Sequence, residues 1–489
     1  MHTPGVNSFR VVLNILSLLV LFFGLLLFVP ASFLLLGPDA AALDFVAAGA
    51  ITLLIGGATF LLTRVRSRDL RARDGFLLVA TTWLVLASVA SLPFYLHLPI
   101  SYTHAFFEAI SGLTTTGATV LTGLDDMPRS ILFWRSMLQW LGGMGILILA
   151  VAILPLLGVG GMQLYKAEIS GPTKDNKLTP RITETAKALW GIYVLLTLLC
   201  FFAYWLAGMS WFDALIHTGT TVSIGGLSSH DASLGHFNSA TIEAVAIVFM
   251  LLSGINFAMH FSAFRRMTIE PYKRCPEARY FLMVVGSGVL LVTLVLWIKG
   301  VYPSFLETFR VAAFNVVSIA TTTGYATTDY SLWPYHLGWL LMLLAAFSTS
   351  SGSTGGGIKM IRLVVMVKLA GRELLRIVHP RAIQPVSLGG GSIGHSVIFA
   401  VLAFMLFYGA TVMVASFLLL LTGLDDTTAI SAVLACINNL GPGLGSVGPA
   451  GNFAGLESFQ LWVLAFTMLL GRLELLTVLV ILVPAFWRK

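Results

Sequence analysis

Four short motifs recur along the chain, roughly 100 residues apart. They read TTTGAT, SIGG, TTTGY and NNLGPGLG, and their first glycines are Gly117, Gly225, Gly324 and Gly441. Main-chain carbonyl oxygens can replace the water shell of a bare cation, and glycine adopts dihedrals that strain other residues. One such motif alone would indicate an ordinary Thr-rich turn. Four copies favour a cation filter built from main chain.

Each motif follows a moderately apolar stretch that predicts a short helix. These stretches are 104–113, 211–220, 304–320 and 427–437. A long apolar stretch flanks each motif, so the repeated unit is a span, a short helix, a glycine motif and a second span. Non-helical backbone is tolerated at membrane depth only where protein buries it or where it lines a wet cavity. The pattern therefore predicts four extended segments that meet around one axis with their carbonyls pointing inward.

The composition places the chain in a lipid bilayer. Its residues are 57% hydrophobic and 10% charged, and a bilayer core of about 30 Å requires about 20 apolar residues per helix. Ten stretches meet this requirement: 11–36, 45–63, 76–98, 131–157, 188–207, 242–264, 281–298, 335–369, 397–421 and 461–486. The first is too long for a signal peptide and lacks a small-residue cleavage pattern, so it is expected to be retained.

We therefore predict an all-α polytopic membrane protein. Four pseudo-repeated units, each with an M1 helix, a pore helix and an M2 helix, are expected to surround one pore. An extra pair of transmembrane helices precedes them. The expected boundaries are 1–65 for the extra pair and 75–158, 186–266, 279–371 and 395–487 for the units, the third with a broken M2 helix.

Basic residues fill every second connection between the predicted spans. Such loops resist translocation, so both termini are expected to be cytoplasmic. The net charge of +7 then reflects membrane topology rather than a nucleic-acid-binding surface. The cysteines Cys200, Cys275 and Cys436 are scattered, so neither a disulfide framework nor a zinc site is expected from them.

A second interruption, FSTSSGSTGGG at 347–357, divides the long apolar stretch 335–369. Glycine and serine disfavour a helix by roughly 0.5 to 1 kcal/mol per position, so this segment is expected to unwind across the inner pore. A phosphate-binding loop is the competing interpretation, but Ile358 stands where that motif needs lysine. Lys359 is expected either to anchor the chain at the inner membrane surface or to act in gating.

Arg472 lies inside the last predicted span. An unpaired charge there costs about 2.5 to 3.5 kcal/mol on insertion scales, so it requires a partner. Glu474 is two residues away and faces another side of the helix. The carbonyl-rich loop 352–357 is the better candidate, and snorkelling of Arg472 to the cytoplasmic surface is the alternative.

Other polar residues are expected to have ordinary roles. Glu108 and His217 lie on predicted pore helices, where structural hydrogen bonding is the favoured interpretation. LTGLDD occurs at 121–126 and at 421–426, in different places of the unit. Both carboxylate pairs are expected outside, as solvated loop charges or as groups that raise the local cation concentration at the mouth.

Together with SGSTGGGIK at 351–359 and MLLGRLELLT at 468–477, the four motifs resemble the Trk/Ktr/HKT superfamily of potassium transporters, in particular its TrkH type. The likeness covers nearly the whole chain. It implies potassium uptake across the bacterial inner membrane, with K+ as the transported ion and no organic cofactor. It also implies a homodimer and a cytosolic TrkA-type nucleotide-binding ring as regulator.

The resemblance assigns roles to individual residues. The filter is expected to comprise Thr115, Thr116, Gly117, Ser223, Ile224, Gly225, Thr322, Thr323, Gly324, Asn439, Leu440 and Gly441. K+ is expected at Thr115, Thr116, Ser223, Ile224, Thr322, Thr323, Asn439 and Leu440. The gate is expected to comprise Gly352, Ser353, Thr354, Gly355, Gly356 and Gly357, with Arg472 holding it closed. Sodium-favouring relatives commonly carry serine at the first filter glycine, so Gly117 favours potassium.

Two other classes of protein fit the composition. An alternating-access carrier also interrupts its spans with glycine and serine, but its halves are inverted, whereas this unit repeats in one direction. An intramembrane enzyme needs a polar catalytic set at membrane depth, and no HExxH or GxSxG motif lies in a predicted span. The sequence therefore indicates that the chain is not an enzyme, and it leaves open whether flux is passive or coupled to Na+ or H+.

Overall fold

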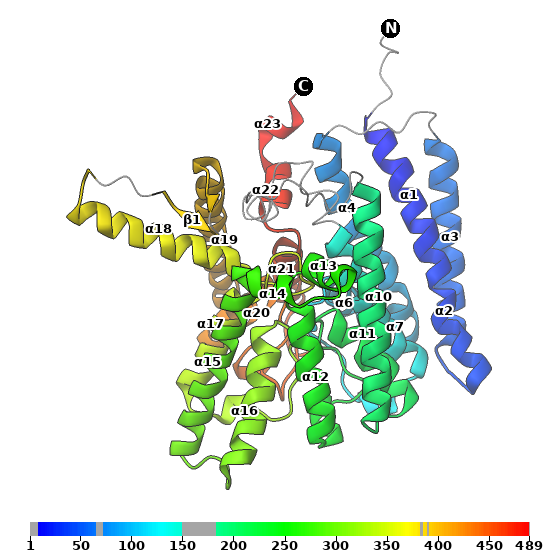
Figure 1. Cartoon of the computed structure of the whole chain (residues 1–489). Coiled ribbons are helices and arrows are strands. Elements are labelled where there is room, and N and C mark those ends of the chain that lie inside the picture. Colours follow the sequence, from blue (N-terminus) through cyan, green and yellow to red (C-terminus); the bar gives the residue numbers. More distant parts are fainter. Residues whose placement is uncertain (1–7, 65–71, 149–181, 382–384, 389–390, 489) are drawn as a thin grey trace.

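The computed structural model describes residues 8–64, 72–148, 182–381, 385–388 and 391–488 (Figure 1). Within these residues the only strands form a short antiparallel hairpin, β1 (Ser387–Leu388) with β2 (Gly391–Ser392). All other regular structure in this part of the chain is helical. The expected helical architecture is therefore confirmed.

An N-terminal helix pair stands at one side of the molecule, drawn in blue in Figure 1. It consists of α1 (Ser8–Leu26), α2 (Phe28–Ala31), η1 (Ser32–Leu36) and α3 (Ala42–Thr63). The glycines let the two long helices approach closely, since a Cβ on Gly56 of α3 would lie 3.1 Å from Leu21 Cγ of α1. Small residues at such seams are the usual means by which membrane helices pack.

The remaining helices repeat one order four times: a long helix, a short helix, a non-helical segment and a further helix. The first set is α4 (Ala72–Ala90), α5 (Leu92–His97), α6 (Tyr102–Leu113) and α7 (Arg129–Ile148); the second is α10 (Ile182–Leu206), α11 (Trp211–Val222), α12 (Ala240–Ser253) and α13 (Phe257–Arg266). The third is α14 (Glu270–Arg274), α15 (Pro276–Ile298), α16 (Phe305–Ala320), α17 (Tyr335–Phe347) and α18 (Met360–Val378). The fourth is α19 (His395–Leu421), α20 (Asp426–Ile437), α21 (Ser458–Arg472), α22 (Leu476–Leu482) and α23 (Pro484–Trp487). The non-helical segments contain the 3-10 turns η2 (Leu124–Asp126), η4 (Ser233–Phe237), η5 (Tyr330–Leu332) and η6 (Gly445–Val447).

The four short helices α6, α11, α16 and α20 begin in the same way. Their N-cap residues are Ser101, Ser210, Ser304 and Asp425. Each side-chain oxygen accepts a hydrogen bond from the backbone amide three residues later, at 2.9 to 3.3 Å. Such a cap satisfies one of the free amides at a helix start and contributes about 1 kcal/mol. The amide of Thr428 also holds the pKa of the Asp425 carboxyl below its usual range, which keeps this cap ionised.

Six helical stretches of the described residues are long and apolar enough to cross a membrane, and the number reaches eight if each of two bent helix pairs is counted as one span. The break predicted within 335–369 is confirmed, because α17 ends at Phe347 and α18 begins at Met360. The predicted spans 242–264 and 461–486 are not continuous helices. They bend by 95° between α12 and α13 and by 116° between α21 and α22. Part of the predicted span 131–157 lies outside the described residues.

Local backbone chemistry explains both bends. Gly254 ends α12, and Asn256 begins α13 as an N-cap whose Oδ1 accepts the Ala258 amide at 2.8 Å. At the second bend, Glu474 and Leu475 have φ of 57° and 48°, which no right-handed helix can contain. A hydropathy pattern does not reveal either feature, because the helices on both sides of each bend are apolar.

Candidate ion pathway

The four glycine motifs lie directly at the C-terminal ends of the short helices. α6, α11, α16 and α20 end at Leu113, Val222, Ala320 and Ile437, and each motif follows at once. The side chains that precede the motif glycines are buried. A helix carries a partial negative charge at its C-terminus, which favours a cation nearby.

The four segments share one backbone conformation. Their first left-handed residues are Thr115, Ile224, Thr322 and Asn439, with φ from 52° to 65°. The next residue donates its amide to a carbonyl of the preceding helix at 2.8 to 2.9 Å; the pairs are Thr116 to Ser111, Gly225 to Thr220, Thr323 to Ser318 and Leu440 to Ala435. The residue after that is a glycine with φ from 74° to 93°: Gly117, Gly226, Gly324 and Gly441. A residue with a Cβ would be strained at this φ.

This register corrects the alignment of the second segment. Alignment by the first glycine of each motif pairs Gly225 with the other three glycines, and it is wrong by one residue, because the backbone equivalent is Gly226. Gly225 instead stands where Thr116 stands in the first segment, and Ser223 stands where Thr114 does. SIGG contains two successive glycines, and only the backbone conformation distinguishes them.

The segments neighbour one another in a closed order. A Cβ built on each left-handed glycine would meet a carbonyl oxygen of the next segment. The distances are 2.1 Å from Gly117 to Gly225 O, 1.9 Å from Gly226 to Thr323 O, 2.1 Å from Gly324 to Leu440 O and 2.8 Å from Gly441 to Thr116 O. The fourth segment thus closes on the first. No other residue fits at these four positions unless a neighbour moves, because real Cβ contacts essentially never fall below 3.0 Å.

Side-chain hydroxyls brace the segments. Thr114 Oγ1 and Thr116 Oγ1 lie 2.7 Å apart, and the pair Thr321 and Thr323 repeats this contact at 2.8 Å. Asn439 Nδ2 donates to Thr116 Oγ1 at 3.0 Å and joins the fourth segment to the first. The threonine hydroxyls therefore brace the segments through contacts with one another and with Asn439.

Gln139 on α7 is a contributor that the motifs did not reveal. Its buried Nε2 donates to Gly225 O at 2.6 Å, and its Oε1 accepts the Leu227 amide at 3.1 Å. A Cβ on Gly225 would lie 2.3 Å from Gln139 Cδ, so the side chain occupies the space that this glycine leaves. A polar residue inside the apolar stretch 131–157 is the signal that could have found it, since such residues rarely face lipid.

The glycine-rich loop, residues 348–359, lies against three of the segments. The Gly356 amide donates to Thr322 Oγ1 at 2.9 Å, and a Cβ on Gly356 would lie 1.9 Å from Asn438 O. Thr354 Oγ1 donates to Val222 O at 3.0 Å. The predicted gate residues are thus brought together at the helix ends that carry the motifs.

The bend between α12 and α13 holds the other end of this loop. The Ser350 amide donates to Gly254 O, and the Phe257 amide donates to Gly352 O, both at 3.0 Å. Within the loop, Ser353 Oγ donates to Ser350 O at 2.6 Å. These backbone bonds tie the third set of helices to the second.

The predicted contact between Arg472 and the loop is confirmed. One terminal nitrogen donates to Thr354 O at 3.0 Å, and the other donates to Gly142 O on α7 at 3.1 Å. Snorkelling to the surface is therefore wrong, because the guanidinium is buried. Glu474 is indeed no partner of Arg472, since it pairs with Arg362 at 2.5 Å.

Lys359 forms a hydrogen bond with the backbone of the same loop. Its buried Nζ donates to Gly355 O at 2.5 Å, so its interpretation as a surface anchor is wrong. Gly352 and Gly357, with φ of 74° and 78°, let the backbone reverse at each side of this contact. The charge of Lys359 faces loop carbonyls rather than lipid headgroups.

Glu108 and His217 make the structural hydrogen bonds expected of them. Glu108 Oε1 accepts Arg135 Nε at 2.8 Å in a buried ion pair, and Arg135 also donates to Ser228 O at 2.9 Å. His217 Nε2 lies 2.9 Å from Ser228 Oγ. These bonds fix the backbone that follows the second segment.

Comparison with known proteins finds similarity to one family over nearly the whole chain. The model of the TrkH family, described as a cation transport protein, matches residues 42–489. The Trk system potassium uptake protein TrkH of Escherichia coli (strain K12) is 47% identical over 483 residues, which cover 98% of this chain and 100% of that protein. TrkG of the same strain is 37% identical over 487 residues, covering 98% and 99%. The crystal structure of the potassium transporter TrkH from Vibrio parahaemolyticus superposes with a TM-score of 0.91 at 44% identity, covering 98% of this chain and 100% of that one. The resemblance seen in the motifs is thus confirmed, and the chain belongs to the TrkH family of cation transport proteins, a family of multi-pass membrane transporters rather than enzymes.

Proposed function

We propose that this chain is the membrane subunit through which a bacterium takes up potassium across its inner membrane. The relatives named above are potassium uptake proteins. The observation that carries the proposal is the closed order of four main-chain segments at the C-termini of four short helices. Backbone oxygens backed by the negative ends of helices suit an alkali cation.

In this proposal four units of M1, pore helix and M2 surround a single pore. The units are 75–158, 186–266, 279–371 and 395–487, and the extra helix pair lies within 1–65. The repeated order of long, short and further helix supports this division. Both termini are cytoplasmic, as the basic connections require.

K+ is held by main-chain oxygens of two successive residues in each segment. With the corrected register these are Thr115 and Thr116, Ile224 and Gly225, Thr322 and Thr323, and Asn439 and Leu440. Ser223 takes the position before them. Contacts such as those of Gln139 and Asn439 hold the ring at a fixed width. A smaller ion such as Na+ is then less well compensated for its lost water.

The glycine-rich loop acts as the gate, and Arg472 holds it closed. The loop residues Gly352, Ser353, Thr354, Gly355, Gly356 and Gly357 are supported in this role by their contacts with the motif-bearing helix ends. Two hydrogen bonds from Arg472 link the loop to α7. Opening of the gate requires the hydrogen bond between Arg472 and Thr354 O to break.

A homodimer and a cytosolic TrkA-type nucleotide-binding ring complete the transporter. The relatives are described as parts of a Trk system, which is the ground for a further subunit. The nucleotide-binding ring regulates the flux of K+ by contacting the cytoplasmic surface of this chain.

Cation flux into proteoliposomes tests the proposal. K+ and Rb+ are expected to enter liposomes that contain the purified chain, Na+ and Li+ are expected to be excluded, and protein-free liposomes give the background. Equal entry of Na+ would remove the selectivity claim. Absence of flux for all four ions from a folded, correctly inserted protein would remove the transport claim.

A further inference from the structure

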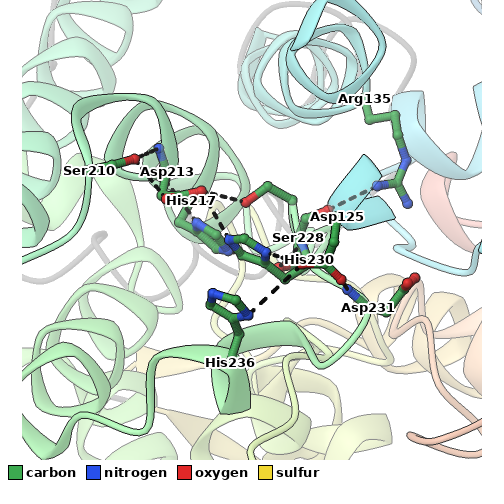
Figure 2. Close-up of polar contacts among 10 residues, drawn as sticks. Asp125, Arg135, Ser210, Asp213, His217, Ser228, His230, Asp231 and His236 are labelled. Carbon is green, nitrogen blue, oxygen red and sulfur yellow. Dashed lines mark hydrogen bonds and ion pairs between the residues drawn. The ribbon is translucent and has the colours of Figure 1, made fainter. Parts of the chain in front are cut away.

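Two histidines and a carboxylate gather in the loops that follow the first and second segments. Asp125 lies in η2, His230 precedes η4, and His236 lies within η4. One ligand atom from each lies within 4.8 Å of the other two. Figure 2 shows the three side chains turned toward one another, although Asp125 and His230 are 105 residues apart in the sequence.

The distances suit a small divalent ion after a modest adjustment. Asp125 Oδ1 lies 2.5 Å from His230 Nδ1 and 3.9 Å from His236 Nδ1. Ligand atoms around tetrahedral Zn2+, at bond lengths of 2.0 to 2.1 Å, stand about 3.3 Å apart. The hydrogen bond between Asp125 and His230 must therefore open by nearly 1 Å, and His236 must approach by somewhat less.

The rings must also tilt. The imidazoles of His230 and His236 stack with centroids 3.6 Å apart and planes 3° from parallel. A metal lies in the plane of each imidazole that binds it, so parallel rings cannot share an ion until one of them rotates. The side chains of His236 and Asp125 are 46% and 47% exposed and have room for this movement, whereas His230 is only 17% exposed.

A carboxylate behind His230 completes the arrangement. His230 Nε2 lies 3.2 Å from Asp213 Oδ1 (Figure 2). Asp213 in turn accepts hydrogen bonds from Ser210 Oγ at 2.7 Å and from Ser229 Oγ at 2.8 Å. A histidine that binds a metal through one nitrogen normally donates the other N–H to such a carboxylate. Asp213 can therefore keep the Nε2 proton of His230, while a metal ion takes the place of the proton in the hydrogen bond between Nδ1 and Asp125.

We propose that Asp125, His230 and His236 bind a divalent transition-metal ion of the Zn2+ class, with water as the fourth ligand. Two imidazoles and one carboxylate favour Zn2+ over Mg2+ or Ca2+, which prefer oxygen ligands alone. The bound ion bridges the loops that follow the first and second segments. Metal binding itself does not depend on the proposed transport function.

The effect on transport rests on the proposed function, in which these loops face the outside of the cell. The ion replaces the negative charge of Asp125 by a net positive charge on the side from which K+ arrives. A positive centre there lowers the local K+ concentration. External Zn2+ therefore slows K+ uptake.

Zn2+ titration by calorimetry of the detergent-solubilised full chain tests the site without transport. One Zn2+ per chain is expected. His236→Ala and Asp125→Asn are each expected to weaken it by about 10-fold or more, and Asp213→Asn by about 10- to 100-fold, the usual range for an outer-shell partner. The matched control is His336→Ala, an exposed histidine at the start of α17, which is expected to bind as the unmodified protein does.

Undetectable Zn2+ binding by the folded protein, or equal binding by the His236→Ala and Asp125→Asn variants, would overturn the site. Thermal unfolding without metal shows whether each variant is folded. In proteoliposomes, external Zn2+ is expected to slow Rb+ entry through the unmodified chain and through His336→Ala but not through His236→Ala. Equal slowing of all three would overturn the link between this site and uptake. A chain that binds Zn2+ but carries no cation would contradict the proposed function alone.

Discussion

Substitution of Gly117 by serine places a side chain against the carbonyl of Gly225 in the neighbouring segment. Gly117 has φ of 84°, and a residue with a side chain in a sparsely populated backbone region costs about 1 to 3 kcal/mol. The serine Cβ would also lie 2.1 Å from Gly225 O, which would have to withdraw by about 1.3 Å to reach the 3.4 Å of ordinary contact. Both effects act on an oxygen that is proposed to hold K+.

The expected result is a loss of discrimination between K+ and Na+. A shift of Gly225 O that relieves about 1 to 3 kcal/mol of strain weakens its contact with K+ by a similar free energy. This corresponds to a change of about 5- to 150-fold in the ratio of K+ to Na+ uptake. The assay is the ratio of initial K+ and Na+ uptake rates into proteoliposomes. Na+ is expected to be excluded by the unmodified chain and admitted by Gly117→Ser.

Gly286→Ser is the matched control for this experiment. Gly286 lies within α15, and a Cβ built on it has no heavy atom within 4 Å. The same substitution there is expected to leave the ratio unchanged. A folded Gly117→Ser protein that still excludes Na+ as the unmodified chain does would refute the argument that Gly117 controls the position of a coordinating oxygen.

Three further variants probe the gate, the register and the buried ion pair. Arg472→Ala is expected to raise Rb+ flux, because it removes two hydrogen bonds from a charged donor, each worth about 1.5 to 3 kcal/mol; flux that stays at the level of the unmodified protein would contradict the latch. Gly225→Ala is expected to lower the thermal unfolding temperature by displacing Gln139, and much less so in a Gln139→Ala background. Additive losses in that cycle would count against the steric assignment. Glu108→Gln is expected to destabilise the protein by about 3 to 5 kcal/mol, since Arg135 would keep an uncompensated buried charge. Thermal unfolding in detergent measures this, and an unchanged midpoint would show that the pair is dispensable.

The non-helical backbone at the four motifs and at the glycine-rich loop could be predicted from the sequence, because it depends on local residue types. Glycine marks a left-handed φ, and serine or aspartate marks a helix start, whatever surrounds them. The choice between Gly225 and Gly226 was not local, because it depends on how the second segment meets Gln139 from another helix. A motif therefore locates such a segment to within a residue and no better.

The helix bends and the histidine cluster illustrate two other limits. Apolar residues flank the bends at Gly254 and at Glu474, so hydropathy cannot distinguish a straight span from a folded one. Asp125 and the two histidines come from loops of different repeats, and no spacing rule joins residues so far apart. The need of Arg472 for a partner could be predicted from the sequence, because an unpaired charge within a span is costly wherever its partner lies.

The hydrogen bonds between the α12–α13 bend and the glycine-rich loop have a mechanical consequence. The loop cannot swing aside as an independent flap, because Gly254 O and Gly352 O take part in backbone bonds that join the two. In the proposed gating, movement of the loop either breaks those bonds or moves α13 with it. α13 ends at Arg266 in a basic stretch expected on the cytoplasmic side. A displacement of α13 from that side would therefore move the loop, and with it the Gly356 amide that is bonded to Thr322 Oγ1.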